Sequence, residues 1–458
     1  MDKYWVKKKR GEKNIKRSLF GELNKDYPKV TFGEGNILTL DEGRKVFDAS
    51  CGAAVSCLGH GDKRVIEAMV KELDKGTPYV ASAFFSSDIT EKLCNNLIEG
   101  TEGKLARVYL TCSGSEATEA AIKIARQYFS EKGEGDTRVK FITRWESYHG
   151  NTLGALSVSG HRARRAPYIP LLMKNVHHIS PCNPYRQKLH GETDVAFVAR
   201  KAAELEAKFQ ELGPETVVAF IAEPVVGAAL GCVPAVPGYL EAMREVCHRH
   251  GALFIVDETM CGMGRTGTLH AWQKEGIVPD IQTMGKGLGG GYQPIAAIMV
   301  SQKIVDTLLD GTSEFIHGHT YEGMPIQAVA ALEIQKIFKE EKLLENVNKQ
   351  GIYLEKRLRN ILAEHPNVGD IRGAGLFWGI EFVKNKISKE PFNSSEHISQ
   401  KIVDLALSKY DMTVYPGTGS VEGVHGDHII LAPSFRITEQ EINYIVDVVS
   451  KTIHEVFS

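Results

Sequence analysis

The sequence lacks the cysteine pattern of a zinc protein or of a disulfide-rich protein. Its eight cysteines include no CxxC pair, and several of them lie in apolar surroundings. Closely spaced pairs are the usual sign of a zinc site, and structural disulfides belong to oxidising compartments. The cysteines therefore predict reduced, buried thiols in a cytoplasmic protein without a metal site.

Long apolar runs and a large net charge are also absent. No apolar run approaches the roughly 18 residues that a membrane-spanning helix needs. The formal net charge is −2, with 55 Lys and Arg against 57 Asp and Glu. These features predict a protein that neither crosses a membrane nor binds nucleic acid. The basic residues 1–20 lack the apolar core of a secretory signal, and they predict a solvated arm that packs on a partner subunit, with organelle targeting as the alternative.

The chain, at 458 residues and 50.6 kDa, is too long for one ordinary core, so more than one domain is expected. Short strand-like pieces separated by Gly and Asp turns precede residue 60. Strands and helices then alternate, which is typical of βαβ units and a mainly parallel sheet. A mixed pattern of helices and strands follows. We therefore predict an N-terminal segment of a small domain over residues 1–60, a large domain over 61–325 and the rest of the small domain over 326–458.

An acid and a lysine follow two predicted strands in the middle of the large domain. The apolar run 252–256 ends at Asp257, and the run 281–284 ends near Lys286 in a glycine-rich turn. Open α/β sheets bind ligands at the carboxyl ends of their strands, so both side chains are candidates for a ligand site. The alternative is that Asp257 caps a helix and Lys286 is a solvated loop residue.

Two further candidates follow earlier strands. The strand 108–111 runs into Gly114 and Ser115 at the start of a helix, where free N–H groups and the helix dipole can bind an anion. An ordinary capped helix is the alternative, but it explains the glycine between two serines less well. Tyr148 follows the strand 140–144, where it could either pack or line a pocket. A flat, phosphorylated pyridine aldehyde would use a phosphate turn, an aromatic ring, a carboxylate and a lysine together.

The order of the motifs SGSEA, YHG, EP, DE with GMGRTG, GKGLGGGY and HTYEG resembles the class III, fold-type I aminotransferases, which depend on pyridoxal phosphate. The resemblance covers nearly the whole chain. It implies an α/β fold with a mainly parallel sheet in a large domain and an α+β small domain built from both termini. It also implies ping-pong transfer between an amine donor and a 2-oxo acid, in a homodimer.

The resemblance gives individual residues their expected roles by matching position. Lys286 is expected to be the Schiff-base lysine, and Asp257 the partner of the pyridine nitrogen. Gly114 and Ser115 are expected to bind the phosphate, and Tyr148 to stack on the ring. The two remaining positions are Thr320, which would reach the phosphate of the neighbouring subunit, and Glu223, which would lie near the substrate amine.

Departures from the family pattern narrow the range of substrates that the resemblance implies. Acetylornithine, ornithine and 4-aminobutyrate members usually carry an arginine where this chain has Asn151, and ornithine-type members tend to carry another where it has Ile430. A second carboxylate bound there is therefore disfavoured. Met260 stands where many members have glutamine near the cofactor's 3-hydroxyl group. In the amine:pyruvate branch an aromatic residue often stands where this chain has Ala54, which suggests a roomier pocket.

The pattern therefore resembles the amine:pyruvate branch, which implies transfer from a primary amine or ω-amino compound to a 2-oxo acid such as pyruvate. Phe84 and Phe85, in a predicted loop between helices, would form the apolar wall of the pocket. The alternatives are an ornithine- or 4-aminobutyrate-type enzyme that uses 2-oxoglutarate, a class III decarboxylase or lyase, and a non-catalytic protein that binds the cofactor. The acceptor carboxylate needs a cation, and the sequence does not choose among Arg162, Arg164, Arg165, Arg372 and Arg436.

Overall fold

The computed structural model describes residues 25–458, so the predicted arm over residues 1–20 lies outside the described residues. Its central sheet has the strand order β4-β12-β11-β10-β7-β5-β6. The strands are β4 (Arg107–Thr111), β5 (Lys140–Arg144), β6 (Val176–Ile179), β7 (Val217–Ala222), β10 (Leu253–Asp257), β11 (Ile281–Met284) and β12 (Ala296–Val300).

The sheet is mainly parallel, as the sequence predicted. β10 pairs in parallel with β7 and β11, and β5 pairs in parallel with β7 and β6. β12 is the exception, because it runs antiparallel to both β11 and β4. The connection from β11 to β12 contains only the short helix η4 (Lys286–Leu288), and a parallel pair would need a longer crossover.

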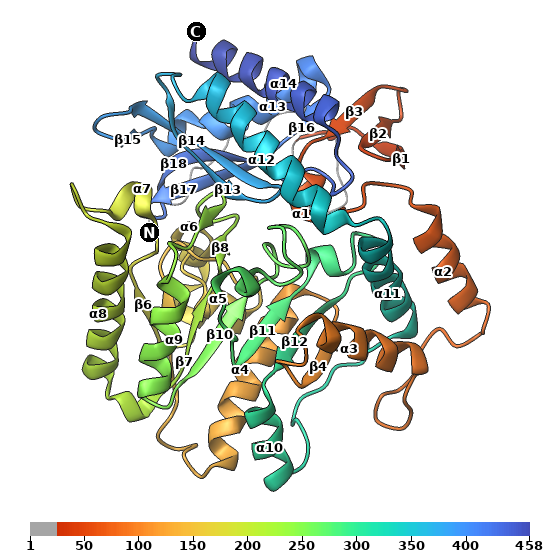
Figure 1. The fold of residues 1–458 in the computed structure, drawn as a ribbon, viewed down its shortest axis with the longest axis vertical. Helices are drawn as coiled ribbons and strands as arrows, with labels where there is room; N and C mark the ends of the chain where they lie inside the picture. Colours follow the sequence, from red (N-terminus) through yellow and green to blue (C-terminus); the bar gives the residue numbers. More distant parts are fainter. Residues whose placement is uncertain (1–24) are drawn as a thin grey trace.

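Both faces of the central sheet are covered by helices (Figure 1), and β10 shows why its sequence is almost wholly apolar. Phe254 and Val256 pack in the core shared with helices α8 (Asp194–Leu212) and α9 (Tyr239–Arg249). Leu253 and Ile255 alternate with them and pack on the other face, in the core that contains the alanine-rich side of α4 (Gly114–Glu131). A strand that is buried on both faces carries an apolar run without alternation.

A second, antiparallel sheet has the order β13-β14-β18-β17 and shares one apolar core with the C-terminal helices. The last helix of this domain begins with a capping box, because the Thr438 side chain accepts from the Glu441 N–H and the Glu441 carboxylate accepts from the Thr438 N–H. The elements are α12 (Leu343–Leu362), β13 (Val368–Ala374), β14 (Phe377–Asn385), α13 (Ile398–Tyr410), β17 (Tyr415–Val421), β18 (His425–Leu431) and α14 (Glu439–Phe457).

The two ends of the described chain meet in a third sheet. β1 (Val30–Glu34), β2 (Ile37–Leu40) and β3 (Lys45–Asp48) pair antiparallel, and β3 then pairs in parallel with β16 (Met412–Thr413). Figure 1 shows these red strands beside the blue C-terminal helices. An association of both termini agrees with the predicted small domain, while the boundaries near residues 61 and 325 stay a prediction.

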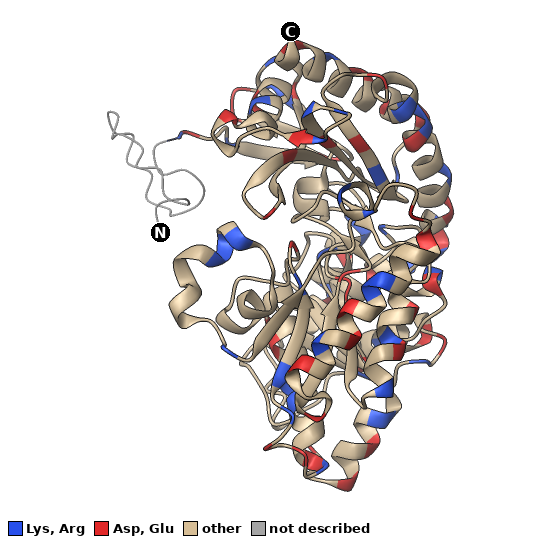
Figure 2. Cartoon of the chain, turned by 90° about the vertical axis from the view of Figure 1, so that its left-hand side faces the viewer, with Lys and Arg blue, Asp and Glu red and all other residues tan. Residues whose placement is uncertain are grey.

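The remaining helices surround this framework, and Figure 2 shows acidic and basic residues interspersed along the helices and loops. None of the helices within residues 25–458 is both long enough and apolar enough to cross a membrane. The eight cysteines are free, and most of them are buried. Further helices are α2 (Lys63–Leu73), α3 (Asp88–Gly100), α5 (Leu153–Val158), α6 (Arg162–Arg165), α10 (Gln302–Asp310) and α11 (Pro325–Glu340).

Candidate functional site

A cavity of about 400 Å³ lies at the carboxyl ends of the parallel strands. The edge of an open α/β sheet is the usual place for a ligand site. The cavity brings together seven of the residues that the sequence singled out, namely Gly114, Ser115, Tyr148, Glu223, Asp257, Met260 and Lys286.

Asp257, the last residue of β10, is held by three neighbours. One oxygen, Oδ2, lies 2.7 Å from Nδ1 of His149. The other, Oδ1, accepts from the Thr283 hydroxyl at 2.7 Å and from the Thr259 N–H at 2.9 Å. Burial alone would raise the pKa of the Asp257 carboxyl, but the hydrogen bonds and the charge of His149 hold that pKa below its usual value. The side chain is therefore a fixed, ionised carboxylate that faces the cavity.

Lys286 faces the same cavity from the turn after β11. Burial lowers the pKa of its amine below the ordinary value of lysine, although the nearby Asp257 and Glu223 oppose this shift. A lowered pKa favours the neutral, nucleophilic amine. The backbone of Lys286 has φ of 40°, in the left-handed region that side chains rarely adopt, and such strain is concentrated at functional sites. The interpretation as a solvated loop lysine does not fit these observations.

The start of α4 forms another part of the cavity wall. Ser113 caps the helix, because its hydroxyl accepts from the Glu116 N–H. Ser115 is fixed by Asn151, whose backbone N–H donates to the Ser115 hydroxyl at 3.0 Å and whose Oδ1 accepts from it at 2.9 Å. The first N–H groups of a helix lack acceptors within the helix, so this turn can bind a phosphate.

Glycine is required at position 114 because the neighbouring atoms leave no space for a Cβ atom. A Cβ atom added to Gly114 would lie 2.5 Å from Cγ2 of Thr259. We expect Gly114→Ala to weaken cofactor binding by roughly 1–3 kcal/mol, since overpacking would displace Thr259 and its bond to Asp257. Cofactor titration measures the effect. The double variant with Thr259→Ser, which removes Cγ2, should recover most of the loss, and a double variant no better than the single one would contradict this explanation.

A hydrogen bond joins Glu223 to Tyr148 on the wall of the cavity that also contains Lys286. The buried Glu223 carboxylate accepts from the Tyr148 N–H at 3.0 Å and from the Gly227 N–H at 3.1 Å. Burial raises the pKa of Glu223. Met260 packs against Gly227, where an added Cβ would lie 2.5 Å from the sulfur of Met260. The wall of the cavity is thus apolar at Met260 and polar at Glu223.

Apart from the candidate arginines, four predicted substrate or phosphate residues do not line the cavity of their own chain. Ala54 is only 3% exposed and is buried in a neighbouring apolar cluster with Met260, while Ala53 and Val55 line the cavity instead. The pocket assignment of Ala54 is therefore corrected to its two neighbours, because the strained backbone at Ala54 turns its side chain into the cluster. The other three are exposed on the surface, and they are Phe84 (80%), Phe85 (69%) and Thr320.

The structure separates the candidate arginines. Arg436 is bound by Asp62 at 2.8 Å and by Glu341 at 2.6 Å, away from the cavity. Arg162 stacks 4.1 Å above the ring of Trp145 and lies 3.5 Å from Glu146. Both assignments as substrate residues are corrected, because these arginines are committed to other contacts. Two further candidate arginines are also committed to other contacts. Arg165 contacts Ser159 and His178, and Arg372 forms ion pairs with Asp370 and Glu381.

Arg164 is the candidate arginine that does line the cavity. Its guanidinium lies 4.4 Å above the ring of Tyr148. It makes no hydrogen bond or ion pair with any residue in 25–458, so its charge is available to an anion. The sequence could not select it, because Arg162, Arg164 and Arg165 lie together on the single turn of α6 and point at different neighbours.

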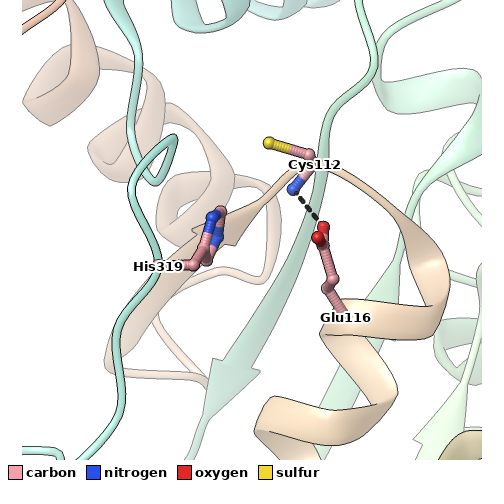
Figure 3. Close-up of side chains that lie close together, drawn as sticks. All are labelled: Cys112, Glu116 and His319. Carbon is pink, nitrogen blue, oxygen red and sulfur yellow. Dashed lines mark hydrogen bonds between the residues drawn. The ribbon is translucent and has the colours of Figure 1, made fainter. Parts of the chain in front are cut away.

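Sequence reasoning also missed a group of side chains at the edge of the phosphate turn. Possible ligand atoms of Cys112, Glu116 and His319 lie within 4.8 Å of one another (Figure 3). The Glu116 carboxylate already accepts from the Cys112 N–H at 2.9 Å. Burial raises the pKa of the Cys112 thiol, which disfavours the thiolate that binds metals. We therefore interpret these three side chains as a structural contact between the phosphate turn and residues 317–323, and not as a metal site.

His149 is the main functional residue that sequence reasoning left open. No role was predicted for the histidine of the YHG motif, yet its ring orients Asp257. The sequence signal that could have identified His149 is its position shortly after β5. In the sheet β5 lies beside β7, and β7 lies beside β10, which ends at Asp257. Since 108 residues separate His149 from Asp257, only the strand order shows that they meet.

Pyridoxal phosphate fits the residues that surround the cavity. The open helix start at Gly114 and Ser115 suits a phosphate, and the buried carboxylate of Asp257 suits a protonated ring nitrogen. Lys286 offers an amine to an aldehyde, and Tyr148 offers a ring face. The phosphate, the ring nitrogen, the aldehyde and the ring face therefore each meet a complementary group on the wall of one cavity.

Comparison with known sequences agrees with this fit. The family model described as aminotransferase class-III matches residues 24–453. An aminotransferase of Gibberella zeae is 47% identical over 437 residues, which cover 95% of this chain and 85% of that protein. A chloroplastic gamma aminobutyrate transaminase of Solanum lycopersicum is 33% identical over 417 residues, covering 90% and 78%.

Comparison with solved structures gives the same result. An (S)-enantioselective omega-transaminase from Thermomicrobium roseum has a TM-score of 0.89 and 34% sequence identity, and the match covers 96% of both chains. An omega transaminase from Pseudomonas jessenii, solved in complex with PMP, has a TM-score of 0.87 and 31% identity over 94% of this chain and 93% of that one.

Proposed function

We propose that this chain, which belongs to the class III aminotransferases and depends on pyridoxal phosphate, moves an amino group from a primary amine or ω-amino compound to pyruvate or a similar 2-oxo acid. The observation that carries the choice is the distribution of cations around the cavity. Asn151 stands where acetylornithine-, ornithine- and 4-aminobutyrate-type members usually carry an arginine, and Ile430 stands where ornithine-type members tend to carry another. Arg164 lines the cavity and is available instead.

The residues of the cavity divide the chemistry among them. Pyridoxal phosphate, when bound, supplies an electron sink for the carbon that bears the amino group. Asp257 holds a proton at the ring nitrogen, and His149, Thr259 and Thr283 keep its carboxylate ionised and aligned. Lys286 holds the cofactor between turnovers, and its released amine moves a proton to and from the substrate α-carbon. Tyr148 orients the ring, and Gly114 and Ser115 bind the phosphate.

Arg164 would bind the carboxylate of the 2-oxo acid. In a ping-pong reaction the donor and the acceptor use the same cavity in turn, so a cation fixed there would hinder an uncharged donor. The ring of Tyr148, 4.4 Å from the guanidinium, gives Arg164 a cation–π contact when no carboxylate is present. The side chain can therefore serve both half-reactions.

We expect Arg164→Ala to raise the KM for pyruvate by about 10- to 100-fold, because it removes a charge-assisted hydrogen bond worth about 1.5–3 kcal/mol. The KM for an uncharged amine should change little. Steady-state kinetics with each substrate varied in turn measure both values. Arg164→Lys keeps the charge and should lose less, and an unchanged pyruvate KM in both variants would show that another group binds the acceptor.

The proposed function is tested by comparing two substrate pairs. One is an aliphatic amine with pyruvate, and the other is ornithine with 2-oxoglutarate. We expect the first pair to give the higher kcat/KM, and a clear preference for the second pair would contradict the proposal. Release of carbon dioxide or phosphate would instead indicate a decarboxylase or a lyase that uses the same cofactor residues.

We also propose that the active unit is a homodimer. The exposed Phe84, Phe85 and Thr320 lie on segments joined by contacts of Glu322, which accepts from the Ser82 and Tyr109 hydroxyls. Large apolar side chains exposed together favour an interface. In a dimer these segments would complete the partner's site, with Thr320 toward the phosphate and the two phenylalanines toward the substrate.

A further inference from the structure

A short hairpin supplies part of the cavity wall, and its loop touches Glu223. The hairpin consists of β8 (Val225–Val226), a loop over residues 227–232 and β9 (Val233–Pro234), and the two strands pair antiparallel. In this hairpin loop Ala228 lines the cavity. The Gly227 N–H donates to the Glu223 carboxylate at 3.1 Å. A shift of the hairpin loop would therefore move both the wall and the donor that holds Glu223.

The antiparallel sheet packs against the hairpin loop through its backbone. Arg372 on β13 is only 7% exposed, and its Nε donates to the Gly231 carbonyl at 3.0 Å. Its Nη2 donates to the Leu230 carbonyl. The residue paired with Arg372 on β14 is Gly379, where an added Cβ would lie 2.0 Å from the Gly231 oxygen. The sheet thus comes close to the loop at a glycine, and the planar guanidinium donates to two neighbouring carbonyls at once, as a lysine amine does not.

Two acids keep the guanidinium of Arg372 in place. Its Nη1 lies 2.5 Å from Oε2 of Glu381 and 3.0 Å from Oδ2 of Asp370. Glu381 is fully buried, and it also accepts from Nε of Arg186 on α7 (Pro184–Gln187) at 2.9 Å. Burial alone would raise the pKa of Glu381, but the charges of Arg372 and Arg186 hold that pKa below its usual value. Arg372 is therefore fixed between ionised acids and the carbonyls of the hairpin loop.

We propose that Arg372 is a positioning residue for the reaction, which acts on Glu223 through the hairpin loop. Its bonds to the two loop carbonyls keep the Gly227 N–H on the Glu223 carboxylate and keep Ala228 in the cavity wall. This inference rests on the proposed function, in which Glu223 lies near the substrate amine. Arg372 does not line the cavity, so the role differs from binding a substrate carboxylate.

Hydrogen exchange of the holoenzyme, followed by mass spectrometry, measures how firmly Arg372 holds the loop. Arg372→Lys keeps a positive charge beside the two acids but loses the paired contact with the carbonyls. We expect the amides of residues 225–234 to exchange about tenfold faster in this variant, because local opening becomes easier, while residues 377–385 on β14 keep their rates. Unchanged exchange of residues 225–234 would overturn the inference.

The matched control is Arg138→Lys. Arg138 is also buried and pairs with an acid, Glu134, at 2.7 Å. It likewise donates to two backbone carbonyls, those of Val217 at 2.7 Å and His250 at 3.0 Å, but it does not line the cavity. Both variants should lower the midpoint of urea unfolding, and only Arg372→Lys should lower kcat/KM for the amine. An equal loss of kcat/KM in both variants would show an effect of stability alone and would overturn the inference.

A double-mutant cycle tests whether Arg372 acts through Glu223. In the unaltered background Arg372→Lys should lower kcat/KM about fivefold to tenfold, as for the loss of one hydrogen bond to a charged group. In a Glu223→Ala background the same change should lower it less than about twofold, because the carboxylate that it positions is absent. Additive losses, or an unchanged kcat/KM in Glu223→Ala alone, would overturn the inference. Absence of turnover of an aliphatic amine with pyruvate by the unaltered protein would overturn the proposed function, and the exchange of residues 225–234 would still decide whether Arg372 holds the loop.

Discussion

Replacing Lys286 with alanine is expected to lower kcat for transamination by roughly 10⁴-fold or more, because the substitution removes both the nucleophile that holds the cofactor and the base that moves the α-proton. The lysine lies on the wall of the cavity, with its pKa lowered by burial. No other lysine lines that cavity among the described residues. A second amine cannot therefore replace it.

Two measurements check the Lys286 prediction. Steady-state assays give the loss of kcat, and borohydride reduction followed by peptide mass analysis shows whether the cofactor is attached to the peptide of residue 286. The variant should still bind the cofactor noncovalently through the phosphate turn. The control variant is Lys303→Ala. Lys303 lies on α10, outside the cavity, and forms an ion pair with Asp280. Undiminished activity in Lys286→Ala would contradict the assignment of Lys286 as the catalytic lysine.

Asp257→Asn is expected to lower kcat/KM by about 10²- to 10³-fold, since it removes one preorganised electrostatic contact. An amide cannot hold a proton at the ring nitrogen, although it can keep the bonds to Thr259 and Thr283. Asp280 provides a matched control, because it is also a buried aspartate, 3.1 Å from His248, but it lies away from the cavity. Asp280→Asn should lower stability and leave kcat nearly unchanged. Equal losses of kcat in both variants would argue against a special role for Asp257.

The pH dependence of Asp257 follows from the direction of its pKa shift. Its folded-state pKa lies below the ordinary 3.8, so the carboxylate contributes stability above about pH 4 and loses that contribution as the pH falls through its folded-state value. Between pH 5 and 9 the group stays ionised. The pH profile of kcat/KM should therefore fall in level but keep its shape in Asp257→Asn. A missing limb in the variant's profile would contradict this assignment.

Much of the fold followed from local patterns. The strands β5 and β11 have the bounds that their apolar runs predicted. β12 could not be oriented from the sequence, because pairing direction depends on the length and path of a connection. The small sheet of β1 to β3 was expected. Its parallel pairing with β16 was not, because the two segments lie more than 360 residues apart in the sequence.

From the sequence alone came the family, through the resemblance of its ordered motifs, and the cofactor chemistry, since a helix start, an acid and a lysine at strand ends are local features. Tertiary structure decided which side chains share the cavity. It selected Arg164 over four other arginines, moved the pocket wall from Ala54 to Ala53 and Val55, and joined His149 to Asp257. These choices depend on packing between distant segments and on the turn that each backbone takes, which no local pattern records.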